Sequence, residues 1–228
     1  MKKPVVDYRQ LRPSRLNEQR FEHLWLLGGW LVYLALYFVT ENLIPVSRCH
    51  VIHCALDDRI PFMEGFLVFY CYWYVLLVGS LAYFLLYDLR SFRRLQIYIM
   101  ITQAVAMLAY ILYPSIQLGR PEAFERDNLL TRLAAFIYAF DTPTGVCPSL
   151  HVAYSMGIAS VWCRARDGNG AWKALMVLSA VVISISTAFV KQHSVVDIFA
   201  AIPVGLLAEI QVFGKTRLNR WIEGKWNP

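Results

Sequence analysis

Long apolar runs alternate with short polar segments along this chain. A helix needs about 20 apolar residues to cross the hydrocarbon core of a bilayer, and the pattern predicts six such helices. They cover about residues 23–44, 62–88, 95–113, 149–163, 171–190 and 194–213. The fourth of these stretches is the shortest. We therefore expect an all-α fold, an integral-membrane six-helix bundle.

The segment between the third and fourth stretches contains an amphipathic helix. Within residues 127–140, apolar side chains recur at helical spacing and share one face. These are Leu129, Leu130, Leu133, Phe136, Ile137 and Phe140. Because this piece is too short to cross a bilayer, we expect it to lie in the membrane interface.

Composition supports the membrane class. Of the 228 residues, 57% are hydrophobic and only 17% are charged, an apolar share above that of soluble domains. The net charge of +6 would suit a nucleic-acid partner, but the cations fall in clusters between apolar runs instead of forming one basic face. The expected partner is therefore the bilayer, with no nucleic acid.

The basic clusters also predict an orientation. They lie before the first stretch, after the second, between the fourth and fifth, and after the sixth. The clusters are Lys2, Lys3, Arg9, Arg12, Arg15 and Arg20; Arg90, Arg93 and Arg94; Arg164, Arg166 and Lys173; and Lys215, Arg217, Arg220 and Lys225. With six crossings all four fall on one side, which the positive-inside rule makes cytoplasmic. We expect cytoplasmic segments at 1–22 and 214–228 around a membrane domain at 23–213, in a bacterial inner (plasma) membrane.

Two histidines and one carboxylate carry the candidate chemistry. In a helix, positions i and i+4 share a face, so Asp197 would accept a hydrogen bond from Nδ1 of His193 and leave Nε2 free. Asp197 lies about one turn inside the last apolar stretch, where an unpaired carboxylate costs about 2.5 kcal/mol or more. His151 offers a complementary acid or base. A purely structural ion pair between His193 and Asp197 is the alternative.

Cations and a helix start near these histidines suggest that the ligand is a phosphate. Ser149 is a good N-cap residue, and the N–H groups of a helix start attract anions. Arg120 and Lys191 would neutralise phosphate oxygens. All of these residues are expected on the extracytoplasmic side, opposite the basic clusters.

The segment between the first two stretches contains residue types that bind metal ions. His50, His53, Asp57 and Asp58 have a zinc-like composition, but structural zinc sets contain more Cys and His ligands at tighter spacing. We favour a polar loop over the site mouth, in which Asp57 or Asp58 contacts a headgroup or pairs with Arg59, and expect no metal or other cofactor. A disulfide between Cys49 and Cys54 stays open, since spacing alone does not define the geometry of the bond.

Taken in order, the motifs resemble the type 2 phosphatidic acid phosphatase superfamily, a family of six-helix membrane proteins. Its pattern is Lys-x6-Arg-Pro, then Pro-Ser-Gly-His, then Ser-Arg-x5-His-x3-Asp. The matching residues are Arg120-Pro121, then Pro148, Ser149 and His151, then Ser186, His193 and Asp197; Tyr113, Leu150 and Thr187 stand where the family has Lys, Gly and Arg. The resemblance covers about residues 113–205. The variant is similar to the branch that contains inositol phosphorylceramide synthases and bacterial relatives.

The resemblance implies a role for each matching residue. His193 is the nucleophile that takes the phosphoryl group, Asp197 orients it, and His151 protonates the departing alcohol. The phosphate-binding positions that it implies are Arg120, Ser149, Leu150 and Ser186, and we add Lys191 as a replacement for a missing family cation.

Three functions remain open at this stage. The first is a lipid-phosphate phosphatase that acts through a phosphohistidine intermediate on a lipid phosphate substrate. The second is a phospholipid or sphingolipid headgroup transferase, in which a second lipid hydroxyl replaces water as the acceptor. The third is a non-catalytic membrane scaffold or transporter, which the loss of the family Lys and Arg favours and the retained histidines oppose.

Overall fold

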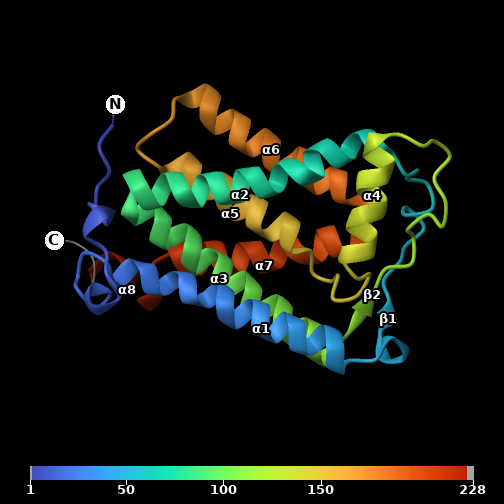
Figure 1. The fold of residues 1–228 in the computed structure, drawn as a ribbon, viewed down its shortest axis with the longest axis horizontal. Helices are drawn as coiled ribbons and strands as arrows, with labels where there is room; N and C mark the ends of the chain where they lie inside the picture. The colour runs from blue at the N-terminus through green and yellow to red at the C-terminus, as the bar shows by residue number, and fades with distance from the viewer. Residues whose placement is uncertain (1, 225–228) are drawn as a thin grey trace.

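The computed structural model describes residues 2–224, and its fold is all-α (Figure 1). Within that range there are eight α-helices and five short 3-10 helices. The α-helices are α1 (Gly28–Leu43), α2 (Leu67–Tyr87), α3 (Leu89–Leu112), α4 (Leu129–Phe140), α5 (Leu150–Arg164), α6 (Gly170–Phe189), α7 (Val195–Phe213) and α8 (Arg217–Gly224). The 3-10 helices are Tyr8–Gln10, Pro13–Arg15, Glu22–Leu27, Val46–Arg48 and Glu64–Phe66. Two-residue strands β1 (His50–Val51) and β2 (Ser115–Ile116) pair in parallel.

Five helical segments are long and apolar enough to cross a membrane, which supports an integral membrane protein. They are Glu22–Leu43, Glu64–Tyr87, Leu89–Leu112, Gly170–Phe189 and Val195–Phe213. The predicted fourth stretch also forms a helix, α5, but its 15 residues extend only about 22 Å, less than the hydrocarbon thickness. It packs in the middle of the bundle against α3, α6 and α7, and most of its residues are buried.

The third helix begins earlier than the sequence pattern predicts. We expected it to start near residue 95, after a basic linker, but α3 starts at Leu89. Asp88 caps it by accepting hydrogen bonds from the backbone N–H of Ser91 (3.1 Å) and from its Oγ (2.7 Å). The arginines that were expected to separate two helices therefore lie inside the first turns of α3.

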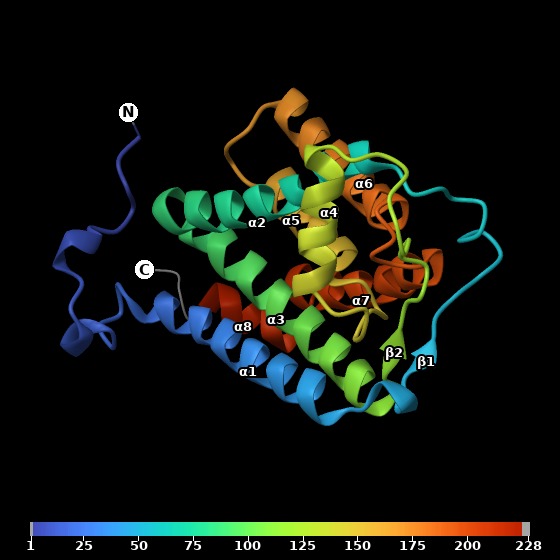
Figure 2. The same ribbon diagram turned by 45° about the vertical axis from the view of Figure 1, so that its right-hand side comes forward.

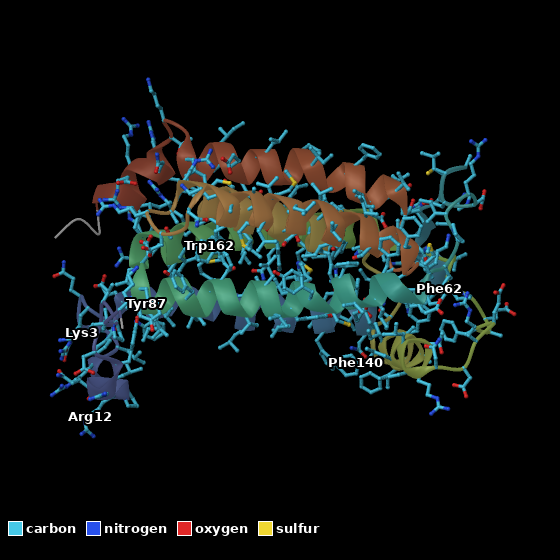
Figure 3. The ribbon with its side chains drawn as sticks, turned by 90° about the horizontal axis from the view of Figure 1, so that it is seen from above. Lys3, Arg12, Phe62, Tyr87, Phe140 and Trp162 are labelled. Carbon is cyan, nitrogen blue, oxygen red and sulfur yellow. The ribbon has the colours of Figure 1, made fainter. Side chains whose placement is uncertain are left out.

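The basic clusters occupy the same end of the bundle, as predicted. Figure 3 shows Lys3, Arg12 and Tyr87 at one end and Phe62 and Phe140 at the other. At the basic end, ion pairs join segments that are distant in sequence. They are Lys2 with Asp167, Arg94 with Glu223, and Arg164 with Glu209. Lys225 of the predicted last cluster lies outside the described residues.

Both flanking segments pack against the bundle. The N–H of Val5 donates to the carbonyl oxygen of Leu86 (2.8 Å), and Phe21 is fully buried. At the other end of the chain, the predicted basic tail contains the amphipathic helix α8. Its Ile222 packs with Tyr98 of α3 and Val212 of α7.

The outward faces of the long helices are apolar. Leu31 and Phe38 on α1, Val75 on α2, Leu178 on α6 and Phe199 on α7 are all exposed large hydrophobic residues. In contrast, several polar side chains of α3 are buried within the bundle, among them Gln96, Thr102 and Gln103. Apolar surface facing outward is the arrangement that a lipid environment stabilises.

Helix α4 runs across the end of the bundle instead of along it (Figures 1 and 2). Its predicted single apolar face is divided into two. Leu130 and Ile137 pack on the bundle near Leu67, whereas Phe136 and Phe140 are 67% and 85% exposed. An Asn128 capping box begins the helix.

Candidate active site

His193 lies in the tight turn between α6 and α7, immediately before the N-cap residue Ser194. Its Nδ1 donates a hydrogen bond to Oδ2 of Asp197 (3.3 Å), and the N–H of Ser194 donates to the same oxygen (2.9 Å). The expected pair therefore forms, but not on one helix face, because Asp197 reaches back across the N-cap. Since Asp197 is fully buried and holds Nδ1, Nε2 of His193 is the ring atom left for chemistry.

Backbone hydrogen bonds fix the turn that carries His193. The N–H groups of Gln192 and His193 both donate to the carbonyl oxygen of Thr187, at 3.0 and 3.2 Å. Lys191 adopts a left-handed conformation with φ of 53°, which costs a residue with a side chain roughly 1 kcal/mol. Thr187 thus contributes a carbonyl that shapes the turn.

His151 lies in the first turn of α5 and points toward α2. Its ring centroid is 4.6 Å from that of Tyr70 and 4.2 Å from that of Trp73. The His193 ring meets it edge-on, with the two centroids 5.6 Å apart. Within residues 2–224, Nε2 of His151 is buried and has no hydrogen-bond partner. The structure therefore brings together the two imidazoles that are far apart in the sequence.

The start of α5 contributes a second unsatisfied polar atom. Ser149 is fully buried, and its Oγ has no hydrogen-bond partner in the described part of the chain. Its backbone N–H donates to the carbonyl oxygen of Asp197 (3.1 Å), which joins the starts of α5 and α7. Leu150 packs its side chain into the apolar core, so only its backbone is available for an anion.

Arg120 lies beside the site, but its donors are largely used by the protein. Its guanidinium donates to the carbonyl oxygens of Tyr138, Asp141 and Thr142 and to the side chain of Gln192. It also stacks over the Tyr138 ring at 4.7 Å. Arg120 thereby ties the end of α4 to the residue before His193. Its Nε is buried without a hydrogen-bond partner among residues 2–224, and its contact with phosphate stays a prediction.

Ser186 and Lys191 differ in what they offer a ligand. Oγ of Ser186 donates to the carbonyl oxygen of Ile183 within α6 (2.7 Å), so its proton is already used. Lys191 and His193 line one cavity of about 280 Å³, and Nζ of Lys191 donates to the carbonyl oxygen of Asp57 (2.8 Å). Lys191 is therefore the predicted cation that shares a cavity with the candidate nucleophile.

The loop between α1 and α2 covers this cavity, and its acidic residues have separate roles. Asp57 accepts hydrogen bonds from Oγ of Ser194 (2.6 Å) and from the N–H of Val195 (2.8 Å), so it caps α7. Asp58 pairs with His53, and His50 stacks on Tyr113. In residues 2–224 no group of three His, Cys, Asp or Glu side chains is placed to hold a metal. All five cysteines are free thiols, Cys49 and Cys54 included.

Asp57 makes stability depend on pH. Burial pushes the pKa of Asp57 upward, but the hydrogen bonds from Ser194, Val195 and Cys54 outweigh it and leave the pKa below its ordinary value of 3.8. A lowered pKa in the folded state means that the ionised carboxylate stabilises the fold above that ordinary value. The stabilisation is lost as the pH falls through the lowered value.

We expect Asp57→Ala to destabilise the protein by about 1–3 kcal/mol, because it removes charge-assisted bonds to the start of α7. Thermal unfolding in detergent should show a lower midpoint for the variant at neutral pH. The gap should narrow below pH 3.8. The neighbouring Asp58→Ala, which removes only an exposed pair with His53, is the matched control. Equal midpoints for Asp57→Ala and wild type at pH 7 would contradict the capping role.

Asp141 is a residue near the site that no sequence pattern selects. It ends α4, and its Oδ2 lies 3.8 Å from a guanidinium nitrogen of Arg120. Burial raises the pKa of Asp141, while the charges of Arg120 and His193 oppose the rise. The carboxylate thus lies beside Arg120 at the end of α4. It belongs to no motif, and only the fold brings it close to Arg120.

Comparison with known proteins adds little to this geometry. No protein-family model matches the chain, and no solved structure matches it. An uncharacterized protein of the archaeon Methanocaldococcus jannaschii is 28% identical over 200 residues, which is 85% of this chain and 79% of the relative. This similarity extends over most of both chains without naming an activity.

Proposed function

We propose that the protein is an integral-membrane enzyme that transfers a phosphoryl group from a lipid phosphate to His193, as a lipid-phosphate phosphatase. The observation that carries the proposal is the meeting of His151 and His193, with ring centroids 5.6 Å apart and Asp197 behind His193. An oriented imidazole next to a second, unpartnered imidazole is the arrangement that nucleophilic catalysis with acid assistance needs. The ordered motif resemblance to the type 2 phosphatidic acid phosphatase superfamily supports the same reading.

In the first step of the proposed reaction, Nε2 of His193 attacks phosphorus and the bond to the lipid oxygen breaks. His151 in its protonated form gives its proton to that oxygen, so the leaving group departs as a neutral alcohol. In the second step His151 removes a proton from water, and the resulting hydroxide attacks phosphorus. The N–P bond then breaks, which frees His193 and inorganic phosphate.

Charge stabilisation in this proposal comes from the chain itself. The transition state of phosphoryl transfer spreads negative charge over the non-bridging oxygens, which positioned donors and cations stabilise. Lys191 lines the cavity with His193, and Oγ of Ser149 is buried without a partner among the described residues. In this proposal these two groups act beside Arg120 and Ser186, whose contacts with phosphate stay predictions.

The membrane arrangement belongs to the same proposal. Counting α5 with the five long helices gives six crossings, and a short crossing helix is tolerated because α3, α6 and α7 surround α5. The positive-inside rule then makes the basic end cytoplasmic and puts the candidate site on the extracytoplasmic face, as in a bacterial inner membrane. The exposed Phe136 and Phe140 of α4 would lie in the interface near that site.

An assay of lipid products tests the function and separates the alternatives. The protein purified in detergent is given a panel of lipid phosphates, alone and with a second lipid that carries a free hydroxyl. Release of inorganic phosphate by the wild-type protein, but not by His193→Gln, supports hydrolysis. A new phosphate-bearing lipid, also absent in His193→Gln, indicates a headgroup transferase. If the wild-type protein gives neither product, both enzymatic hypotheses are overturned and a scaffold or transporter is favoured.

We expect Lys191→Ala to lower turnover about 10–100-fold, because it removes the cation that shares the cavity with His193. Lys191→Arg, which keeps the charge, should retain most of the activity. Neither variant changes the need for a left-handed backbone at this position. Full activity in Lys191→Ala would remove Lys191 from the site.

A further inference from the structure

A second polar cavity lies at the basic end of the bundle, at the opposite end from His193. Its volume is about 800 Å³. Four parts of the chain enclose it, namely the N-terminal segment, the turn between α2 and α3, the end of α5 and the helix α8. Its charged lining residues are Lys2, Arg20, Asp88, Arg90, Arg93, Arg94, Arg164, Arg166, Asp167 and Glu223.

Cations outnumber acids around this cavity. Seven lining side chains are cationic and three are acidic. Glu18 and Glu209, outside the lining, pair with Arg20 and Arg164, so two positive charges remain in excess. The three acids already have partners in the protein. Asp88 accepts from Ser91, Asp167 pairs with Lys2, and Glu223 pairs with Arg94 and lies 3.7 Å from Arg90.

Two of the arginines are largely buried. Arg93 is only 8% exposed. Nε of Arg94 is buried and has no hydrogen-bond partner within residues 2–224. Arg94 pairs with Glu223 through another guanidinium nitrogen, and guanidinium groups bind phosphate oxygens through paired donors.

The positive-inside rule alone does not account for this arrangement. That rule requires basic residues near the helix ends, but it does not require them to converge. Here cations from three separate segments surround one cavity at the end of the membrane helices. A basic pocket between helices at the cytoplasmic side is the kind of site that binds phosphate-bearing lipid headgroups.

We propose that this cavity binds a phosphate group, supplied by the headgroup of an anionic phospholipid from the surrounding membrane. Leu89, Val5 and Ile222 also line the cavity, so apolar surface is present beside the cations for the first part of an acyl chain. The site is separate from His193 and does not depend on the proposed reaction. Free phosphate shares the recognised chemistry, and the experiment distinguishes the two sources.

Lipid binding to the purified full-length protein in a zwitterionic detergent tests the proposal. Affinity is measured by native mass spectrometry and by thermal stabilisation, with phosphatidylglycerol, phosphatidylcholine and inorganic diphosphate as probes. Each removed cation should weaken phosphatidylglycerol binding about five-fold, and the double variant Arg94→Gln with Arg166→Gln about 25-fold. Phosphatidylcholine binding should be weak and the same in all variants. Arg12→Gln, which removes an exposed cation outside the cavity, is the matched control and should bind like wild type.

Each outcome either supports or overturns the proposed site. Selective loss of phosphatidylglycerol binding in the cavity variants supports the site, and competition by diphosphate at millimolar concentration adds that the phosphate group is what it recognises. Tight binding of diphosphate without any preference for phosphatidylglycerol would overturn the lipid source. An equal loss in Arg12→Gln would overturn the site itself, because it would mean diffuse surface attraction. If Arg94→Gln fails to fold, the exposed Arg166→Gln alone carries the comparison.

Discussion

Replacing His193 by glutamine should reduce turnover of a lipid phosphate at least about 1,000-fold, because the proposed reaction has no other acceptor for the phosphoryl group. Glutamine is close to histidine in size and still offers polar atoms to Asp197, so the turn between α6 and α7 should keep its shape. Rates are measured as phosphate release by protein in detergent. Thermal midpoints of wild type and variant should agree within a few degrees.

The comparison with Asp197→Asn sharpens this first prediction. Asparagine keeps an oxygen for the N–H of Ser194 but cannot stabilise a positively charged His193. Turnover should fall by about 10²–10⁴-fold while the protein stays folded. A structural ion pair would behave differently, with lost stability and a rate per folded molecule close to that of wild type. Lost stability with a rate per folded molecule close to that of wild type would contradict the nucleophilic role of His193.

The second large effect is expected at His151. Its replacement by glutamine should lower turnover of an ordinary lipid ester about 10²–10⁴-fold, because the alcohol must then leave without a proton. The ring stacks against Tyr70 and Trp73, so glutamine leaves a partly apolar gap but no unpaired charge. We expect a modest loss of stability beside the large loss of rate.

Leaving groups of different basicity test the role assigned to His151. A substrate whose leaving group is a weakly basic phenol needs no proton, so His151→Gln should process it at close to the wild-type rate in the first step. An alkyl ester should show the full loss. Equal losses for the two substrates would mean that His151 positions the ligand and does not act as an acid.

The coarse fold could be predicted from the sequence because a bilayer constrains helices strongly. Long apolar runs predicted six of the helices, five of which are long and apolar enough to cross a membrane. The basic clusters predicted that both flanking segments meet at one end. The start of α3 was missed because Asp88 caps a helix whose first turns are basic. Helix α8 was missed because its charged residues were interpreted only as an orientation signal.

The candidate site was only partly predictable. His151, His193 and Asp197 carry motif spacing, and the structure brings them together. Side-chain direction does not follow from spacing. The hydrogen bonds that Arg120 and Ser186 donate to backbone carbonyl oxygens could therefore not be predicted. Asp57 and Asp141 could not be assigned for a similar reason.

Asp57 and Asp141 reach the site through loops. Asp57 caps α7 from a segment more than a hundred residues earlier in the chain, and Asp141 lies 3.8 Å from Arg120 at the end of α4. Neither contact follows a helical or strand period. Residues of this kind are visible only once the loops are placed against the bundle.

A phosphorylated His193 is the most direct test of the account. Protein mixed with a lipid phosphate labelled in its phosphoryl group is quenched in base within milliseconds, because phosphohistidine survives alkali, and the peptides are examined by mass spectrometry. We predict label on the peptide that contains His193, absent in His193→Gln and accumulating in His151→Gln with a phenolic leaving group. Active protein that never carries label on His193, or carries it on another residue, would contradict the account.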